Sequence, residues 1–401
     1  MTSTHRLSNL LRGMAAAVLL WLAACGGGVE TGGTGATGAY VEGPITGFGS
    51  IVVGGIRFDE GSATVTDAED RPFDRANLRL GMLVEVQSDR PADDGSGGRS
   101  AKATRVRLGG SLVGPLEAIT PGGTFIRVLG QVVRLTPATV FDGVPGGLAG
   151  LRVDDVLEVH GFPSPDVALS DLVATRVERR SSVPAQFRVR GVARDVNAMG
   201  TPPTLRVGTA VFDLSAGVPA GLANGSVVRL AVGTTQVNGR WPVVLAAVES
   251  RRLDDRDEAE VEGLVTALDS QTSFSVNGVP VDASVAAFPD GPVSLGTRVE
   301  VEGRVANGVL VATKVELRSD DELLNEGIEL RGTLSGLNSG ATTFVLRGVT
   351  IFYGTVPPPE YVAPASEAGL ADGQCVRVRA RLDADRTRVI ATRIEFRNSC
   401  T

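Results

Sequence analysis

The strongest constraint on this chain is an internal repeat that runs through most of its 401 residues. Three short signatures return in the same order at intervals of roughly 70 residues, and such self-similarity is typical of an array of copies of one structural unit. The first signature is a glycine that opens an apolar segment. It occurs at Gly43, Gly114, Gly191, Gly263 and Gly332. We therefore expect five copies of one fold.

The second signature reads Gly-x-x-Val, and the third, which follows it, reads Ala-Thr-basic-Val or a close variant. The Gly-x-x-Val segments start at Gly81, Gly225, Gly296 and Gly373, and Asp154 stands in this place in the second copy. The third signature occupies residues 103–106, 174–177, 312–315 and 391–394. In the third copy we place it, in degenerate form, at residues 246–249.

The clearest copy spans residues 260–318. At residues 299–302 valine alternates with glutamate, which is the period-two pattern of a half-buried strand. Asn-Gly pairs at 277–278 and 307–308 each separate two apolar runs. Both residue types tolerate the positive φ of a type I′ turn, so each pair predicts a hairpin.

About five short strands with glycine-rich corners match a small Greek-key barrel. We therefore predict an all-β fold, a tandem array of about five OB-like five-stranded barrels, since a single barrel of this size buries little surface. The predicted barrels occupy residues 40–110, 111–183, 184–253, 258–319 and 326–401.

These signatures resemble those of an uncharacterised family, catalogued as domain of unknown function 5666, that occurs in bacterial lipoproteins. The likeness is closest in the first copy, where residues 49–58 (GSIVVGGIRF) look like the characteristic strand of that family. It extends over most of residues 42–397, with greater divergence in the second, third and fifth copies. The resemblance implies an OB-like barrel and a location in the cell envelope, and it implies no activity, ligand or catalytic residue.

The N-terminus predicts a lipoprotein signal peptide over residues 1–25. Basic residues precede the apolar run MAAAVLLWL, which is too short to span a bilayer. The run ends in Leu22-Ala23-Ala24-Cys25, which resembles a lipobox, so we predict lipidation at Cys25. The alternative is an ordinary secretory signal with an incidental cysteine. Gly26 after the cysteine resembles a signal for the outer membrane, and residues 26–39 predict a flexible Gly/Thr-rich tether.

Two cysteines remain in the last copy, Cys375 and Cys400. They lie at similar distances from a predicted turn at 383–387, so both should reach the open end of one hairpin. An exported protein meets oxidising conditions, and neither a C-x-x-C pair nor a nearby histidine favours redox or metal chemistry. We predict a structural disulfide between them, worth roughly 3 kcal/mol.

The sequence offers little for catalysis, and we predict no enzyme, no cofactor and no metal. Once His5 leaves with the signal peptide, His160 is the one remaining histidine, and we expect an exposed or hydrogen-bonded strand residue there. One histidine cannot complete a triad or a histidine-rich zinc site. The acidic runs at 254–257 and 67–70 could hold Ca²⁺, but arginines lie among them or follow at once, and solvated linkers or turns explain both better.

Nucleic acid is an unfavourable partner, because the net charge is −7 and aromatic residues make up only 4% of the chain. The hypothesis we favour is a non-catalytic, membrane-anchored envelope protein whose barrels form a structural or protein-interaction array. The alternative is a lipoprotein that binds a small ligand or glycan through an OB-like groove. The proline-rich segment 356–361 fits either a partner-binding loop or a rigid surface excursion.

Overall fold

A computed structural model of the chain describes residues 36–94, 98–164, 169–248, 253–318, 328–362, 366–398 and 400. Residues 37–401 belong to one compact unit. Its described elements are β-strands and three short 3₁₀ segments, Arg75–Asn77, Gly147–Gly150 and Glu367–Gly369. Within the described part of the chain, no helix has the length and hydropathy needed to cross a membrane.

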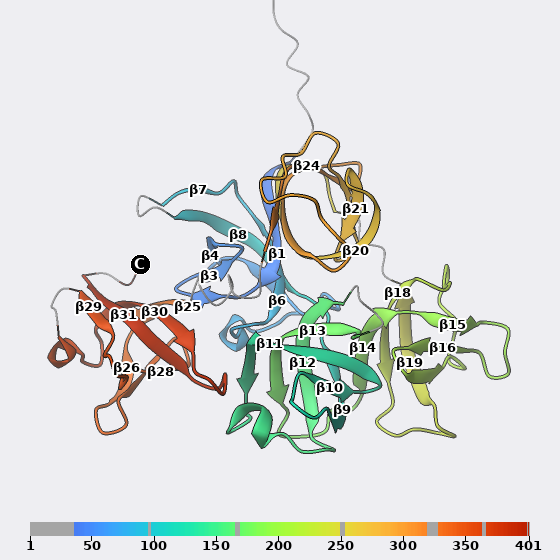
Figure 1. Cartoon of the computed structure of the whole chain (residues 1–401), viewed down its shortest axis with the longest axis horizontal. Helices are drawn as coiled ribbons and strands as arrows, with labels where there is room; N and C mark the ends of the chain where they lie inside the picture. Colours follow the sequence, from blue (N-terminus) through green and yellow to red (C-terminus); the bar gives the residue numbers. More distant parts are fainter. Residues whose placement is uncertain are drawn as a thin grey trace, which may run out of the picture. The chain divides into compact units, whose positions relative to one another are not determined.

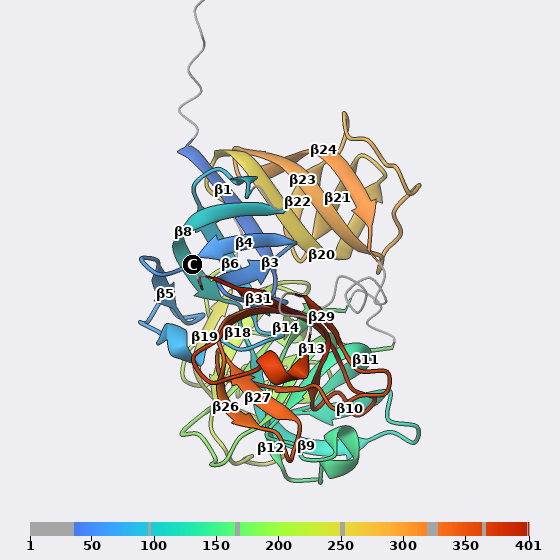
Figure 2. The same ribbon diagram turned by 90° about the vertical axis from the view of Figure 1, so that its left-hand side faces the viewer.

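The fourth copy shows the repeating fold most simply. Its strands are β20 (Arg256–Ser270), β21 (Ser273–Val276), β22 (Val279–Asp282), β23 (Arg298–Ala306) and β24 (Val309–Leu317). They pair in the closed order β20-β23-β24-β22-β21-β20, in which only β22 and β24 run parallel. Figure 1 and Figure 2 show this orange barrel from two sides. The prediction of five-stranded OB-like barrels is confirmed here.

Alternation along the strands builds the barrel core. Val261, Val299, Val301 and Val315 point inward and are almost fully buried. The hairpins follow the predicted turn chemistry, since Asn277 and Asn307 adopt φ of 50° and 55°. The Asn277 side chain also accepts a hydrogen bond from the Leu264 N–H, which ties the hairpin to β20.

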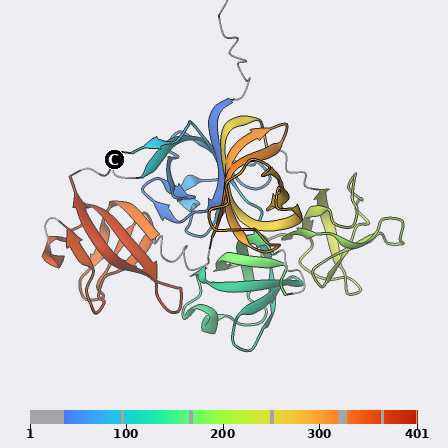
Figure 3. The ribbon, with the colours of Figure 1, turned by 45° about the horizontal axis from the view of Figure 1, so that its top comes forward.

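The second copy repeats this five-strand plan, and the first, third and fifth copies add further short strands. Figure 3 shows the fifth copy in red. The first copy contains β1 (Ala36–Pro44), β2 (Gly47–Phe48), β3 (Ile51–Val53), β4 (Ile56–Asp59), β5 (Thr64–Thr66), β6 (Leu83–Ser88), β7 (Ala92–Asp93) and β8 (Arg99–Leu108). The second contains β9 (Leu112–Ile119), β10 (Phe125–Val128), β11 (Gln131–Asp142), β12 (Val156–Pro163) and β13 (Leu172–Arg179).

The third copy contains β14 (Phe187–Val192), β15 (Arg194–Asn197), β16 (Thr204–Val207), β17 (Ala210–Asp213), β18 (Val227–Val232) and β19 (Trp241–Val248). The fifth contains β25 (Ile328–Thr333), β26 (Ser335–Asn338), β27 (Thr343–Leu346), β28 (Val349–Phe352), β29 (Glu360–Val362), β30 (Cys375–Leu382) and β31 (Val389–Arg397). The short β29 lies in the predicted proline-rich excursion and pairs with β31, so that segment is partly a sheet edge.

The second sequence signature marks a backbone position that needs positive φ. Gly81, Gly225, Gly296 and Gly373 adopt φ between 77° and 92°, and Asp154 adopts 72° in the second copy. Glycine occupies such a conformation without steric cost, and aspartate is among the residues that tolerate it. The substitution at Asp154 therefore preserves the turn.

The third signature marks a β-bulge in the last strand of each barrel. The register shifts opposite the threonine, for example between Glu302 and Gly303 in the fourth copy. Thr104, Thr313 and Thr392 each donate a hydrogen bond from Oγ1 to the carbonyl of the residue that begins the shift. Threonine thus satisfies a carbonyl at the point where the ladder is interrupted.

The strand register corrects our placement of this signature in the third copy. Leu230 pairs with Ala246 and Val232 with Val243, whereas the equivalent pairs in the fourth copy are Val301–Val315 and Gly303–Ala312. The signature therefore corresponds to residues 243–246 (Val-Val-Leu-Ala), not to residues 246–249. It was missed because none of its four residues matches the pattern of the other copies.

Two predicted linkers also contain strand residues. β1 begins at Ala36, inside the predicted tether 26–39, and Ala39 pairs with Ser88 of β6. β20 begins at Arg256, inside the predicted charged linker, where Arg256 is buried and donates a hydrogen bond to the Ala39 carbonyl. Neighbouring strands offered hydrogen-bond partners that composition alone did not reveal.

Candidate binding site

The predicted lipidation site, Cys25, lies outside the described residues, as does the signal peptide. The predicted pair Cys375 and Cys400 forms a disulfide, with the Cα atoms 5.2 Å apart. Cys375 lies at the start of β30, opposite Arg397 at the end of β31, so the bridge closes the open end of this hairpin. It fastens the C-terminal strand to its barrel.

The last strand of each barrel has an outer edge that four copies cover in the same way. The basic residue of the third signature pairs there with a parallel segment of the same copy. The pairs are Arg105 with Thr64, Arg176 with Val140, Lys314 with Ala287 and Arg393 with Glu360. These four edges are closed by the chain itself.

The third copy leaves this edge open. β19 pairs with β17 only through Trp241 and Pro242, and no described residue pairs with its outer edge from Val243 to Val248. Leu245 occupies the position that is basic in the other copies, and its residue is 63% exposed. Beside it, Val244 is 52% exposed and replaces the threonine of the signature. An uncovered strand that carries exposed aliphatic side chains is a site for pairing with another chain.

The barrel interior next to this edge is also less covered. Ala246 is half-buried, whereas its counterparts Val106, Val177, Val315 and Ile394 are fully buried. The smaller side chain and the missing covering strand expose the same part of the core. Sequence reasoning missed this site because the signature was aligned three residues too far along the chain.

A second feature is the environment of His160 on β12. Its side chain is 1% exposed, and neither ring nitrogen has a hydrogen-bond partner among the described residues. The nearest carboxylate oxygen, Glu158 Oε1, lies 3.6 Å from Nε2, which is beyond hydrogen-bond distance. The expectation of an exposed or hydrogen-bonded histidine is therefore wrong.

Burial lowers the pKa of His160 to about 4 from its ordinary value of 6.5, because removal from water disfavours the charged ring. Glu158 opposes this effect, while Arg176 and Arg188 add to it. His160 is therefore a neutral imidazole at physiological pH, with one nitrogen that can donate and one that can accept a hydrogen bond.

His160 lines a pocket of about 250 Å³. Its walls come from the turn that follows β5, from Glu158 and His160 of β12, and from the outward face of β14, β18 and β19. Leu245 and Ala247 lie on its rim, so the pocket borders the open edge of β19.

The carboxylates around this pocket are paired with arginines. Arg71 binds Asp67 and Glu69 in the turn after β5, which confirms the prediction of a polar turn there. Glu158 accepts hydrogen bonds from Ser111, Arg180 and Arg188. Among the described residues, neither nitrogen of the His160 ring in this wall has a hydrogen-bond partner.

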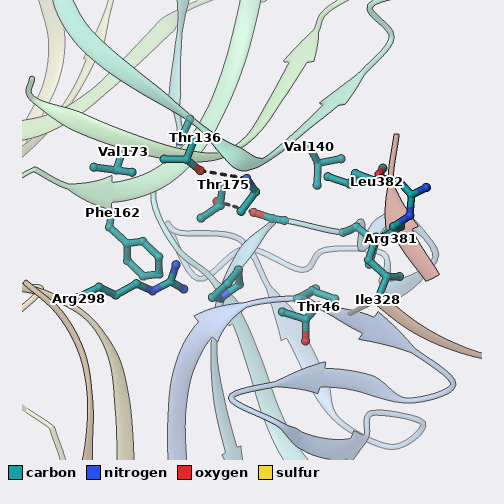
Figure 4. Close-up of a pocket in the computed structure, with 16 residues that line it drawn as sticks. Thr46, Thr136, Val140, Phe162, Val173, Thr175, Arg298, Ile328, Arg381 and Leu382 are labelled. Carbon is teal, nitrogen blue, oxygen red and sulfur yellow. Dashed lines mark hydrogen bonds between the residues drawn. The ribbon is translucent and has the colours of Figure 1, made fainter. Parts of the chain in front are cut away.

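A smaller pocket, drawn in Figure 4, is mostly apolar. Its volume is about 70 Å³, and Phe162, Val173 and Leu382 contribute to its walls. Its polar groups already have partners: the Thr175 hydroxyl donates to the Gly81 carbonyl, and Arg298 binds Glu262 and lies 5.2 Å from the centre of the Phe162 ring. We interpret this pocket as a packing gap.

A cluster of carboxylates lies on the fourth barrel, where oxygens of Glu300, Glu302 and Glu316 come within 4.8 Å of one another. Lys314 binds two of these carboxylates and Arg318 binds the third. These cations supply the positive charge that a metal would otherwise bring. The acidic run at 254–257 joins no carboxylate cluster of this kind within the described residues.

Comparison with known families supports the repeat. A family model described as domain of unknown function (DUF5666) matches residues 40–96, 113–178, 262–316 and 331–395. The chain belongs to this family. The matches cover the first, second, fourth and fifth copies and omit the third, the copy with the open edge.

No curated protein matches the chain. Nine chains of solved structures do, among them one described as drosophila Unr CSD456. That match is 15% identical and covers 46% of this chain and 87% of the other. Its TM-score is 0.15, so it carries no functional argument.

Proposed function

We propose that this protein is a non-catalytic, lipid-anchored envelope protein whose barrels form a protein-interaction array. The observation that carries the proposal is the open edge of β19 in the third copy. Strand addition to such an edge is a common mode of peptide recognition, because main-chain hydrogen bonds supply affinity and side-chain pockets supply specificity.

The other four copies indicate which partner would fit. In each of them a segment runs parallel to the last strand and pairs with the residue equivalent to Leu245. We therefore propose that an extended segment of a partner protein runs parallel to β19. Because Val244 and Leu245 replace a threonine and a basic residue, the partner strand should present aliphatic side chains to them.

The membrane anchor is part of the same proposal. Lipidation at Cys25 would hold the array at the outer membrane, and several acyl chains together give stable anchoring. Replacement Cys25→Ser should move the protein from the membrane fraction to the soluble fraction. If the variant stays with membranes after a salt wash, the anchor lies elsewhere.

Site-specific photocrosslinking in the producing cell tests the interaction. A photoreactive amino acid in place of Leu245 should form one dominant adduct with another protein, and the same group in place of Leu295 should not. Leu295 is a suitable control because it is similarly exposed, at 54% against 63%, on a different copy. The double change Val244→Thr with Leu245→Arg restores the pattern of the other copies and should lower partner binding by about tenfold.

Hydrogen exchange then examines the binding mode. With the crosslinked partner added, the outward amides of residues 243–248 should become protected, because they would enter a new ladder. Equal adducts at both positions, or a partner that leaves these amides unprotected, would overturn strand addition. An adduct between two copies of this chain would replace the proposed partner by self-association.

A further inference from the structure

We propose that the pocket around His160 binds an uncharged, hydroxyl-bearing ligand of the size of a sugar ring. This site is distinct from the strand-addition site, although Leu245 borders both. Three features of the pocket favour such a ligand: its charges, the unpaired imidazole and its volume.

The charge balance disfavours a charged ligand. Each carboxylate in the pocket wall has an arginine partner: Asp67 binds Arg71, Glu69 binds Arg71, and Glu158 binds Arg188. The remaining arginines of the wall are also engaged, since Arg229 donates to the Ala68 carbonyl and Arg190 has a partner of its own. An anion or a cation would have to compete with these pairs and would lie close to a charge of its own sign.

The imidazole of His160 lacks a hydrogen-bond partner, and this indicates which interaction a ligand would supply. The ring of His160 is buried in the wall, and both of its nitrogens are unsatisfied among the described residues. Buried polar groups in proteins are almost always hydrogen-bonded, so we expect the ring nitrogens to bind a group from outside the chain. A neutral imidazole offers one donor and one acceptor, and a hydroxyl group can serve either.

The surroundings suit a ligand with several hydroxyl groups. Gln186 can both donate and accept hydrogen bonds, and the Ser111 hydroxyl, which donates to Glu158, can still accept one. Phe73 adds an apolar surface. The volume of about 250 Å³ lies just below the range of about 300–1,000 Å³ that is usual for drug-sized ligands. A single sugar ring satisfies both the size and the pattern of polar groups.

The histidine count of the chain allows a direct test. The unprocessed chain, with residues 1–25 retained, has two histidines, His5 and His160, so labelling it with ¹⁵N-histidine gives two sets of ring signals. We would titrate D-glucose, D-galactose and N-acetyl-D-glucosamine separately into the millimolar range, with sodium sulfate as the anionic probe. We expect at least one sugar to shift the His160 ring signals and leave those of His5 unchanged.

Two variants test whether the sugar binds to the nitrogens of His160. His160→Phe keeps an aromatic ring but removes both nitrogens and should weaken binding of that sugar by about tenfold. His160→Gln keeps a donor and an acceptor and should retain more of the binding. If either variant fails to fold, the titration of the unmodified protein still decides the question.

Three outcomes would overturn the inference. The first is that no sugar shifts the His160 signals, in which case the pocket holds only water. The second is that sulfate shifts them instead, which would indicate an anion site. The third is an equal shift at His5, which would indicate nonspecific binding. Because the β19 edge is unchanged in His160→Phe, failure here leaves the crosslinking result at Leu245 as an independent test of strand addition.

Discussion

The environment of His160 in the structure differs from the one that the sequence predicts. In sequence it stands in an alternating strand next to Gly161, which is typical of an exposed or structural histidine. In the structure its side chain is almost fully buried in the wall of a pocket, and Glu158, Arg176 and Arg188 are the charged groups that act on it. Burial is the main cause of its lowered pKa, and one of the charged groups, Arg188, comes from the third copy.

The first prediction concerns its titration. The pKa of His160 is about 4 in the folded protein and 6.5 ordinarily, so between these values the unfolded chain binds more protons than the folded one. His160 therefore favours the folded state fully above about pH 6.5, and this contribution falls as the pH drops toward 4. Ring ¹⁵N shifts of His160 should give a midpoint near pH 4.

The matching stability measurement uses His160→Phe. This variant lacks the titrating group, so its loss of stability between pH 6.5 and 4 should be smaller than that of the unmodified protein. A titration midpoint near 6.5 would mean that the ring is solvated in solution.

At the scale of single elements, the turn marked by the second sequence signature needs a positive φ and, in the first copy, also makes a close contact. Gly81 and Gly225 occupy the same place in two copies and adopt φ of 77° and 90°. A Cβ at Gly81 would lie 2.6 Å from the Thr175 carbonyl oxygen, whereas a Cβ at Gly225 would meet nothing within 4 Å. Substituting each glycine in turn therefore distinguishes the cost of backbone strain, which both positions share, from the cost of a steric clash, which only Gly81 has.

The second prediction follows from this pair. Gly225→Ala should cost about 1 kcal/mol in the free energy of unfolding, because alanine resists positive φ. Gly81→Ala should cost more, about 2–4 kcal/mol, because the turn must also move away from Thr175. Chemical denaturation of both variants measures the difference. Equal costs would show that the contact between Gly81 and Thr175 is absent or yields easily.

The third prediction concerns the hairpin of β30 and β31. The Cys375–Cys400 bridge links residues 25 apart in sequence, and a loop of this length contributes roughly 3 kcal/mol on the chain-entropy model. Cys375→Ser should therefore lower the unfolding temperature under oxidising conditions and should match the unmodified protein in reductant. Cys400→Ser is the control and should behave identically, and a loss that persists in reductant would indicate a packing role for the thiol.

At the scale of the whole molecule, polar side chains on the outside of the barrels are buried by other copies. Arg298 and Glu262 on the fourth barrel form an ion pair that is almost fully buried, and Arg298 also lies over the ring of Phe162 from the second copy. In sequence these residues look like the exposed side of a half-buried strand. Burial makes the pair sensitive to the loss of either partner.

The fourth prediction tests this dependence. Arg298→Leu leaves Glu262 buried without its cation and should cost about 3–5 kcal/mol in the free energy of unfolding. The double change Arg298→Leu with Glu262→Leu should recover much of that loss, because no uncompensated charge stays buried. A double-mutant cycle in denaturant measures the coupling. Additive costs would mean that the pair is exposed to water in solution.

Local physics allowed much of the fold to be predicted from the sequence. Alternating valines, Asn-Gly turns and glycines at positive φ act over a few residues, so the all-β class, the repeat and the barrel type followed from residues such as those at 277–278 and 299–302. The pairing of Cys375 with Cys400 followed for the same reason, because one hairpin brings the two cysteines together.

Only the tertiary structure decided which edges and polar groups are left without partners. The open edge at Leu245 became visible through strand register, which depends on hydrogen bonds between segments far apart in the chain. The burial of His160 arose where side chains from three copies meet around one pocket. The period-two pattern of apolar residues indicates which face of a strand packs into its own barrel. The environment of the opposite face depends on contacts between copies, which this pattern does not indicate.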